Sequence, residues 1–172
     1  MQPGVFGAVA VRAERRANPL HLDRRDRDAG ELCALRMDYL EELHGPLRPQ
    51  DSAALRQSLP DYFERHLGED LCACLCECEG RAAAMALLQT QERPPNLHAP
   101  SGRCGRIISV YTVPRFRRMG LAGRVVGRLV DHARKMELHY LELEATAAGR
   151  AVYERLGFRA VEPDDTPMEL EL

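Results

Sequence analysis

The chain has 172 residues, of which 45% are hydrophobic and 29% are charged, and its formal net charge is -2. This length fits one domain, or two at most, and the composition is that of a globular protein, which excludes disordered and collagen-like chains. The near-zero charge balance also disfavours a dedicated nucleic-acid-binding protein, because such a protein usually carries a strongly basic surface. Any anion-binding site in this chain must therefore be local.

The first residues show neither a targeting signal nor a membrane anchor. Their longest apolar run, residues 5–11, is far shorter than the roughly 20 residues that span a bilayer, and the first four residues lack the basic start of a signal peptide. We therefore expect a cytoplasmic protein that does not bind a membrane. Residues 1–19 match no periodic template, so we expect an N-terminal extension of unknown role, followed by a single domain over residues 20–172.

Six cysteines and six histidines raise the question of a metal site. Four cysteines alternate along residues 71–78, and on a strand their side chains would share one face, about 6.6 to 7 Å apart. One extended strand cannot wrap them around a tetrahedral zinc ion, and neighbours at this spacing are poorly placed for a disulfide. With no C-x-x-C and no H-E-x-x-H motif in the sequence, we expect no metal and interpret the cysteines as small buried side chains.

Two helices are expected in the first third of the chain. Asp28 followed by Glu31 forms a capping-box pattern, and apolar residues then recur at helical spacing up to Pro46, where a helix cannot continue. A second helical pattern covers residues 51–68 and contains Pro60, where we expect an interruption.

The rest of the chain alternates between strand and helix patterns. Two strand patterns flank a tight turn, which predicts a hairpin, and a Pro-rich loop follows. The clearest strand is a β-branched and aromatic run closed by Pro114, and the order strand, helix, strand after it implies a parallel pair. The expected elements are strands 71–77, 82–90, 106–113 and 140–145, a loop 92–102, helices 121–136 and 149–156, and final strands 158–161 and 168–172.

The strongest functional signal lies between Val113 and Gly123, at the junction of a strand and a long helix. Unpaired N–H groups and the helix dipole favour a phosphate at such a position, and Gly120 would let the backbone approach it closely. The alternative is a solvated basic helix start with a glycine for packing. A Walker loop is excluded because no Gly-Lys pair occurs, and the glycine spacing also breaks the dinucleotide fingerprint. The segment carries three arginines, Arg115, Arg117 and Arg118.

A known pyrophosphate-loop pattern consists of Gln or Arg, two residues, Gly, one residue, then Gly or Ala. Residues 117–122, Arg-Arg-Met-Gly-Leu-Ala, fit every fixed position. Three flanking segments match the motifs that accompany this loop, in order and at the usual spacing: residues 110–114, 142–146 and 149–158. On these motifs the chain resembles the GNAT superfamily of acyl-CoA-dependent N-acyltransferases, most strongly over residues 104–172.

The resemblance implies a mixed α/β fold, with a central, mostly antiparallel sheet, a parallel strand pair that splays at the CoA site, and flanking helices. Acetyl-CoA would lie in the opening between the strands that end at Val113 and Ala145, and the amides of residues 118–123 would hold its pyrophosphate. The implied cofactor-binding residues are Tyr111, Thr112 and Val113 for the pantetheine arm, and Arg117, Arg118, Met119, Gly120, Leu121, Ala122 and Gly123 for the pyrophosphate.

The implied activity is transfer of an acetyl group from acetyl-CoA to a primary amine of a small molecule or a peptide. The amine would attack the thioester directly, while a backbone N–H stabilises the oxyanion. Tyr153 matches the family's general acid, which protonates the departing thiolate; the alternative is that it only packs on the cofactor. Residues 104–113 contain no carboxylate, although many members place the base there, so the base stays unnamed among Asp38, Glu41, Glu42 and Glu144.

A rival interpretation is a non-catalytic acyl-CoA-binding or sensing domain, which would keep the phosphate loop yet lack a working base. The missing carboxylate favours this rival, whereas Tyr153 favours the enzyme. A dinucleotide-binding oxidoreductase is disfavoured because the fingerprint glycines are missing. Acidic residues of the first two helices either attract a cationic amine or form solvent faces. Acceptor, acyl chain length and a homodimer are left open.

Overall fold

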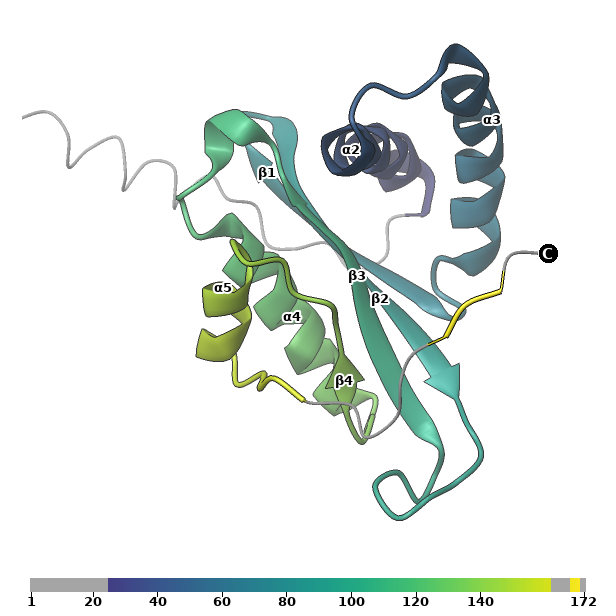
Figure 1. Cartoon of the computed structure of the whole chain (residues 1–172), viewed down its shortest axis with the longest axis vertical. Helices are drawn as coiled ribbons and strands as arrows, with labels where there is room; N and C mark the ends of the chain where they lie inside the picture. Colours follow the sequence, from purple (N-terminus) through teal and green to yellow (C-terminus); the bar gives the residue numbers. More distant parts are fainter. Residues whose placement is uncertain (1–24, 162–167, 171–172) are drawn as a thin grey trace, which may run out of the picture.

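The computed structural model describes residues 25–161 and 168–170, with side chains from residue 29 onward. The expected boundary between an extension and a domain at residue 20 lies outside the described residues. Figure 1 shows a twisted sheet with helices α2 and α3 on one face and α4 and α5 on the other. The mixed α/β architecture expected from the sequence is confirmed.

The sheet has the strand order β1-β2-β3-β4. The β1/β2 and β2/β3 pairs are antiparallel, whereas β3 and β4 are parallel. The strands are β1 (Leu71–Cys78), β2 (Arg81–Glu92), β3 (Arg103–Thr112) and β4 (Leu141–Glu142). The helices are α2 (Arg25–His44), α3 (Pro49–His66), the 3-10 turn η1 (Pro114–Phe116), α4 (Leu121–Lys135) and α5 (Arg150–Arg155).

Two of the helix predictions were wrong in detail. Helix α2 begins at Arg25, so Asp28 lies inside the helix and not at its N-cap. Helix α3 continues through Pro60, which lies on the exposed side. A proline removes one helical hydrogen bond, but Phe63, only 1% exposed, packs into the core one turn later. Tertiary packing of the flanking residues therefore outweighs the local break.

The strand predictions for the C-terminal part also need correction. Strand β4 is shorter than the expected 140–145, and residues 158–161 and 168–170 form no strand; residues 171–172 lie outside the described part. A strand requires a hydrogen-bonded neighbour as well as β-propensity. In the described structure Met168 and Leu170 are 93% and 81% exposed, and neither residue pairs with a strand of the sheet. The alternating sequence pattern alone was not sufficient.

Each face of the sheet carries its own hydrophobic cluster. The α4-side core contains Val125, Val126 and Leu129, which are fully buried against sheet residues such as Leu88. The α2-side core joins α2 and α3 to the opposite face. The spacing of the buried α4 residues confirms the amphipathic helix expected from the sequence. No described helix has the length and apolarity that a membrane crossing requires.

The alternating cysteines of β1 are part of the α4-side core, as expected. Cys74, Cys76 and Cys78 are buried there, and no disulfide joins the cysteines of the described residues. Burial raises the pKa of the Cys74 thiol to about 12, and it raises the pKa of Cys76 as well. Within residues 25–161 and 168–170 no group of three or more His, Cys, Asp or Glu residues could hold a metal ion. These thiols fill space and are not set up as nucleophiles.

This burial predicts that Cys74 does not react with a thiol reagent in the native protein. With a pKa of about 12, only about one Cys74 thiol in ten thousand is ionised at pH 8. Alkylation at pH 8 followed by peptide mass spectrometry should find Cys74 unmodified in native protein and modified after denaturation. Rapid modification of native Cys74 would contradict the packing of β1.

Gly105 lies where β3 first meets β4, and its size decides how closely they pack. A Cβ at this position would come within 2.8 Å of both Leu141 Cδ2 and Leu88 Cδ1. A side chain at residue 105 would therefore push β4 and β2 away from β3 at the start of the parallel pair.

We predict that Gly105→Val lowers the free energy of unfolding by about 1 to 3 kcal/mol, because it overpacks this junction. Gly30→Ala in α2 is the matched control, because an added Cβ there meets nothing within 4 Å. Alanine in a helix should leave stability equal or raise it by about 0.5 to 1 kcal/mol. Urea unfolding of both variants tests this; an unchanged midpoint for Gly105→Val would contradict it.

Candidate active site

Strands β3 and β4 separate almost as soon as they meet. Only Gly105↔Leu141 and Arg106↔Glu142 are paired, yet β3 continues to Thr112. Beyond Arg106, the edge of β3 that faces β4 has no strand neighbour in the described structure. The backbone N–H and C=O groups on this edge are therefore available to a ligand. We call this space the β3/β4 opening.

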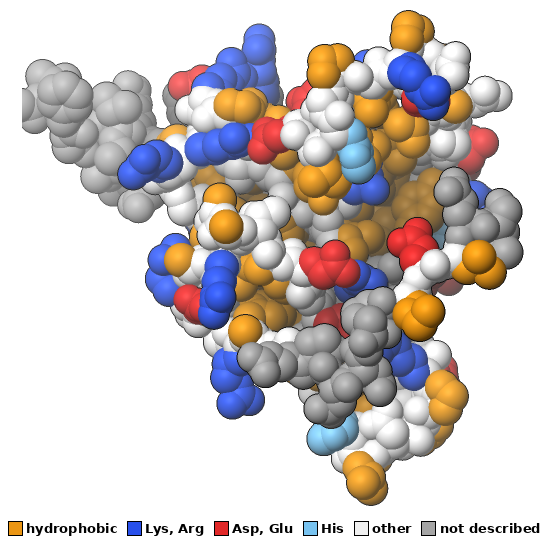
Figure 2. Space-filling model, in the orientation of Figure 1, with side chains coloured by type: hydrophobic (Ala, Val, Ile, Leu, Met, Phe, Trp, Pro, Cys, Tyr) orange, Lys and Arg blue, Asp and Glu red, His pale blue; other side chains and the backbone are white. Residues whose placement is uncertain are grey.

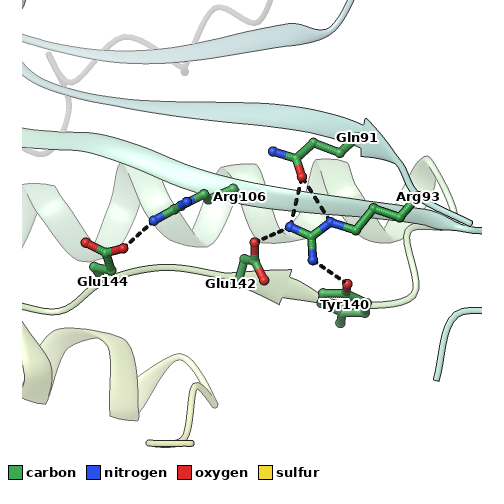
Figure 3. Close-up of polar contacts among 6 residues, drawn as sticks. All are labelled: Gln91, Arg93, Arg106, Tyr140, Glu142 and Glu144. Atoms are coloured by element: carbon green, nitrogen blue, oxygen red, sulfur yellow. Dashed lines mark hydrogen bonds and ion pairs between the residues drawn. The ribbon is translucent and has the colours of Figure 1, made fainter. Parts of the chain in front are cut away.

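Arg93 holds the closed end of the opening together (Figure 3). Its Nη2 donates to Glu142 Oε1 at 2.6 Å and to Gln91 Oε1 at 2.9 Å, while Nη1 donates to Tyr140 Oη at 3.1 Å. One guanidinium thus joins the end of β2 to Glu142 of the short strand β4 and to Tyr140, which directly precedes that strand. This clamp makes up for the brief backbone ladder.

A β-bulge bends β3 along the open edge. Met85 pairs with Tyr111 and Leu87 pairs with Ile108, so β3 contains one extra residue between these pairs. Ser109, in this bulge, has a φ of 54°, an unusual left-handed value for a non-glycine residue. Arg36 Nη1 of α2 donates a hydrogen bond to Ser109 Oγ at 2.6 Å. A bulge re-aims the residues that follow it, here the last residues of β3 at the mouth of the opening.

The loop after β3 leads directly into α4. Val113 N–H donates to Ala83 O at 2.9 Å, and Phe116, 6% exposed, anchors the 3-10 turn in the core. Arg118 and Gly120 then have left-handed φ values of 64° and 76°. These two positions turn the chain so that α4 starts at the mouth of the opening.

The first turn of α4 has the properties of an anion-binding site. The first amide that bonds back is Arg124, which donates to Gly120 O at 3.2 Å. The amides of Leu121, Ala122 and Gly123 donate to no described residue, and no side chain caps the helix. A Cβ built on Gly120 meets nothing within 4 Å, so the space in front of these amides is open. Free amides at the positive end of a helix favour an anion such as a phosphate.

The loop arginines differ in what they contact. Arg117 Nε donates to Thr112 O at 2.9 Å, and its guanidinium forms an ion pair with Glu42 of α2. It also lies over the Tyr111 ring, 5.9 Å from the centroid. The Arg115 guanidinium lies 4.5 Å from the centroid of the Phe116 ring. The Arg117 side chain thus links the loop to α2, which the motif alone did not indicate.

Two glycines of α4 lie against the α5 segment. A Cβ on Gly123 would lie 3.6 Å from Val152, and one on Gly127 would lie 3.5 Å from Leu156. Both are ordinary van der Waals distances, so an added methyl group would fit at either position. The amide of Gly123, which donates to no described residue, belongs to the first turn of α4.

Tyr153 of α5 is buried in the α4-side core and is 9% exposed. Its ring makes an edge contact with Phe158, with centroids 6.2 Å apart. Burial raises the pKa of Tyr153, and the proximity of Tyr39 on α2 adds to this effect. The phenol is therefore protonated at neutral pH and can donate a proton or a hydrogen bond.

Helix α2 places aromatic and acidic side chains beside the end of β3. Tyr39 and Tyr111 make an edge contact with centroids 6.4 Å apart. The pKa of Tyr111 is raised first by burial and then by the charges of Asp38 and Glu42. No sequence motif marks Tyr39 or Arg36 as a site residue. Their spacing on the inward side of α2 was the available signal, because helical neighbours three and four residues apart share a face.

None of the four candidate bases is a buried carboxylate. Asp38 and Glu41 are exposed, Glu42 is paired with Arg117, and Glu144 is paired with Arg106 and is 87% exposed. In the view of Figure 2, acidic and basic side chains lie next to each other across the middle of the molecule, and hydrophobic surface is recessed beside them. The described structure therefore singles out no base among the four.

One buried polar atom at the end of β3 has no partner in the described structure. Thr112 Oγ1 is fully buried and makes no hydrogen bond within the described structure. Native proteins pair nearly all buried polar atoms, so this hydroxyl at the end of β3 is a candidate ligand contact. Together with the free edge of β3 and the free amides of α4, it outlines a site for an elongated ligand with a phosphate end.

Comparison with known proteins agrees with this geometry. The family model described as "Acetyltransferase (GNAT) family" matches residues 32–158. The chain belongs to the GNAT acetyltransferase family. It is thus an acyltransferase of the EC 2.3.1 class, and the resemblance of its motifs to this family is confirmed. No curated protein sequence matches it.

Several solved structures share the GNAT fold. A predicted acetyltransferase with acetyl-CoA from Clostridium acetobutylicum is 28% identical, with a TM-score of 0.71 over 89% of this chain and 94% of that one. A GCN5-related N-acetyltransferase from Ralstonia eutropha is 21% identical, with a TM-score of 0.71 over 87% and 97%. A glucosamine-6-phosphate N-acetyltransferase from Arabidopsis thaliana is 21% identical, with a TM-score of 0.63 over 87% and 96%. The last two comparisons show the fold alone.

We predict that Gly120→Arg in this GNAT acetyltransferase abolishes CoA binding, because the new side chain would fill the open space before the α4 amides. Gly157→Arg is the matched control: Gly157 also has a positive φ, 94°, and an added Cβ also meets nothing within 4 Å. Both variants have similar backbone strain, but residue 157 lies after α5. Calorimetric titration with CoA should show loss of binding only for Gly120→Arg, and equal affinity of the two variants would refute the loop assignment.

Proposed function

We propose that the protein transfers an acetyl group from acetyl-CoA to a primary amine by direct attack on the thioester. The β3/β4 opening, which ends at the free amides of α4, is the observation that carries this proposal. Its free strand edge suits the amide-containing pantetheine arm, and its helix end suits the pyrophosphate. The 28% identical structure with acetyl-CoA supports the same assignment.

The proposed binding residues follow from this arrangement. Of the three residues expected to pair with the pantetheine arm, Val113 already uses its N–H for Ala83 O and its C=O for Phe116 N–H, and Thr112 O accepts from Arg117 Nε. The proposed contacts are therefore backbone groups of Tyr111 and the N–H of Thr112, and Thr112 Oγ1 is a buried group in need of a partner. The pyrophosphate would accept hydrogen bonds from the loop and first-turn amides of residues 118–123. In this assignment Arg117 contributes through its backbone, because its guanidinium is bound to Glu42 and Thr112 O.

The reaction needs four changes in bonding. The amine nitrogen forms a bond to the thioester carbon, and the C–S bond breaks. A backbone N–H on the free edge of β3 stabilises the negative charge on the carbonyl oxygen. The phenol of Tyr153 donates a hydrogen bond to the departing thiolate, which takes up a proton from water, and the ammonium formed by the attacking amine loses its proton to water.

The energetic role of Tyr153 is expected to be modest. A thiol titrates near 8.5, so the CoA thiolate leaves readily without full protonation. Burial raises the pKa of Tyr153 above its ordinary value, which keeps the phenol protonated and also makes it a weaker acid than the thiol. Its hydrogen bond to the developing thiolate then contributes more than complete proton transfer.

The first experiment follows thiol release from acetyl-CoA with a panel of amines. Amine-dependent release would establish the transferase reaction, whereas binding of acetyl-CoA without release by any amine would favour the sensing domain. The panel includes polyamines, amino acids, aminoglycosides and peptides, because neither a small-molecule nor a peptide acceptor is excluded. Binding of NAD but not acetyl-CoA would refute both interpretations.

We predict that Tyr153→Phe lowers kcat by about tenfold, in line with a modest acid role, and leaves CoA affinity unchanged. Tyr140→Phe is the control, because Tyr140 lies at the closed end of the opening with Arg93. Since the pKa of Tyr153 is raised, the ratio of wild-type to variant rate should stay constant between about pH 7 and 9. Equal kcat values for Tyr153→Phe and wild type would return this side chain to a packing role.

A further inference from the structure

Arg36 is a cation on the inward side of α2. Its Nη1 donates to Ser109 Oγ at 2.6 Å, and its guanidinium lies 5.1 Å from the centroid of the Tyr39 ring. Ser109 is itself 5% exposed and belongs to the bulge of β3. These contacts fix the guanidinium beside the β3/β4 opening, on the face covered by α2 and α3.

No carboxylate of the described structure pairs with Arg36. The ion pairs of the described residues use other arginines, and the groups that influence its titration are the phenols of Tyr39 and Tyr62. An arginine carries five N–H donors, and the hydrogen bond to Ser109 Oγ uses one of them. Among the described residues, only Thr112 Oγ1 is a side-chain polar atom that is both buried and without a hydrogen-bond partner. The Arg36 nitrogens that make no hydrogen bond are therefore not fully buried, and a ligand can reach them from solvent.

The surroundings of Arg36 favour binding of an anionic ligand. Burial lowers its pKa, which means that the protein has removed water from this cation without providing a counter-charge in the described part. The hydroxyl groups of Tyr39 and Tyr62 lie nearby and can also donate hydrogen bonds. By contrast, Arg93, Arg106 and Arg117 are each paired with a glutamate.

We propose that Arg36 binds an anionic group, a carboxylate or a phosphate, on the amine that the enzyme acetylates. This inference rests on the proposed function, because it identifies the class of its acceptor. A planar guanidinium held by Ser109 and Tyr39 presents paired donors that match either oxyanion. Ser109 lies three residues before Thr112 on the same strand, in the bulge of β3. The acceptor is then a molecule that carries both an amine and an anionic group.

The test compares matched amines that differ only in the anionic group. Glucosamine 6-phosphate is compared with glucosamine for phosphate, and β-alanine with β-alaninamide for carboxylate, by thiol release from acetyl-CoA. We expect kcat/KM to be at least about tenfold higher for the charged member of the preferred pair, as for a hydrogen-bonded charge. Arg36→Gln should remove this preference mainly through KM, and Arg36→Lys should restore part of it.

Arg56→Gln is the control variant, because Arg56 is an exposed arginine of α3. It should keep the full preference, and circular dichroism and melting should show that Arg36→Gln is folded. Equal rates for charged and neutral members, or an equal loss for both members in Arg36→Gln, would overturn the anion site while leaving the transferase intact. Absence of thiol release from both pairs, when another amine of the panel releases thiol, would overturn this inference alone. Absence of release with every amine of the panel would overturn the proposed function as well.

Discussion

The early end of the β3/β4 ladder is the constraint on which the whole site depends. Two paired residues hold the strands together, and the remaining backbone of β3 is left without a strand neighbour. Unpaired backbone groups are costly when they are buried, so the protein keeps them at an opening that a ligand can enter. The Arg93 clamp and the close packing at Gly105 make this arrangement stable, because they fix β4 firmly at one end.

Around this opening, the two faces of the sheet supply different chemistry. The α4 side provides free amides at the start of α4 and the buried phenol of Tyr153. The α2 side provides Tyr39, Arg36 and acidic side chains, and it is the side on which an acceptor amine is proposed to bind. The bulge at Ser109 connects the two sides, because it is part of the strand that borders the opening and also accepts a hydrogen bond from α2.

Much of this architecture followed from local patterns in the sequence. The buried face of α4, the cysteine strand and the order strand, helix, strand were all found from periodicity, since burial imposes a period of 3.6 or 2 on the side chains. The loop from Arg117 to Ala122 was found because close approach to a phosphate requires particular residue types at fixed spacing. The continuous helix through Pro60 was not predicted, because it depends on the packing of Phe63 against sheet residues far along the chain, such as Tyr111. The ion pair between Arg117 and Glu42 joins two segments that are far apart in the sequence, and no local sequence pattern indicates such a contact.

The ion pair between Arg117 and Glu42 links the loop before α4, the proposed pyrophosphate site, to helix α2. Because Arg117 also donates to Thr112 O, a displacement of the loop is mechanically connected to both the strand and the helix. Thermodynamic linkage makes any such coupling reciprocal, so the two substrates would influence each other's affinity by the same factor. Both side chains are partly exposed, and pairs of this kind contribute at most about 1 kcal/mol. The energy of this contact therefore limits the cooperativity that it can transmit to about fivefold.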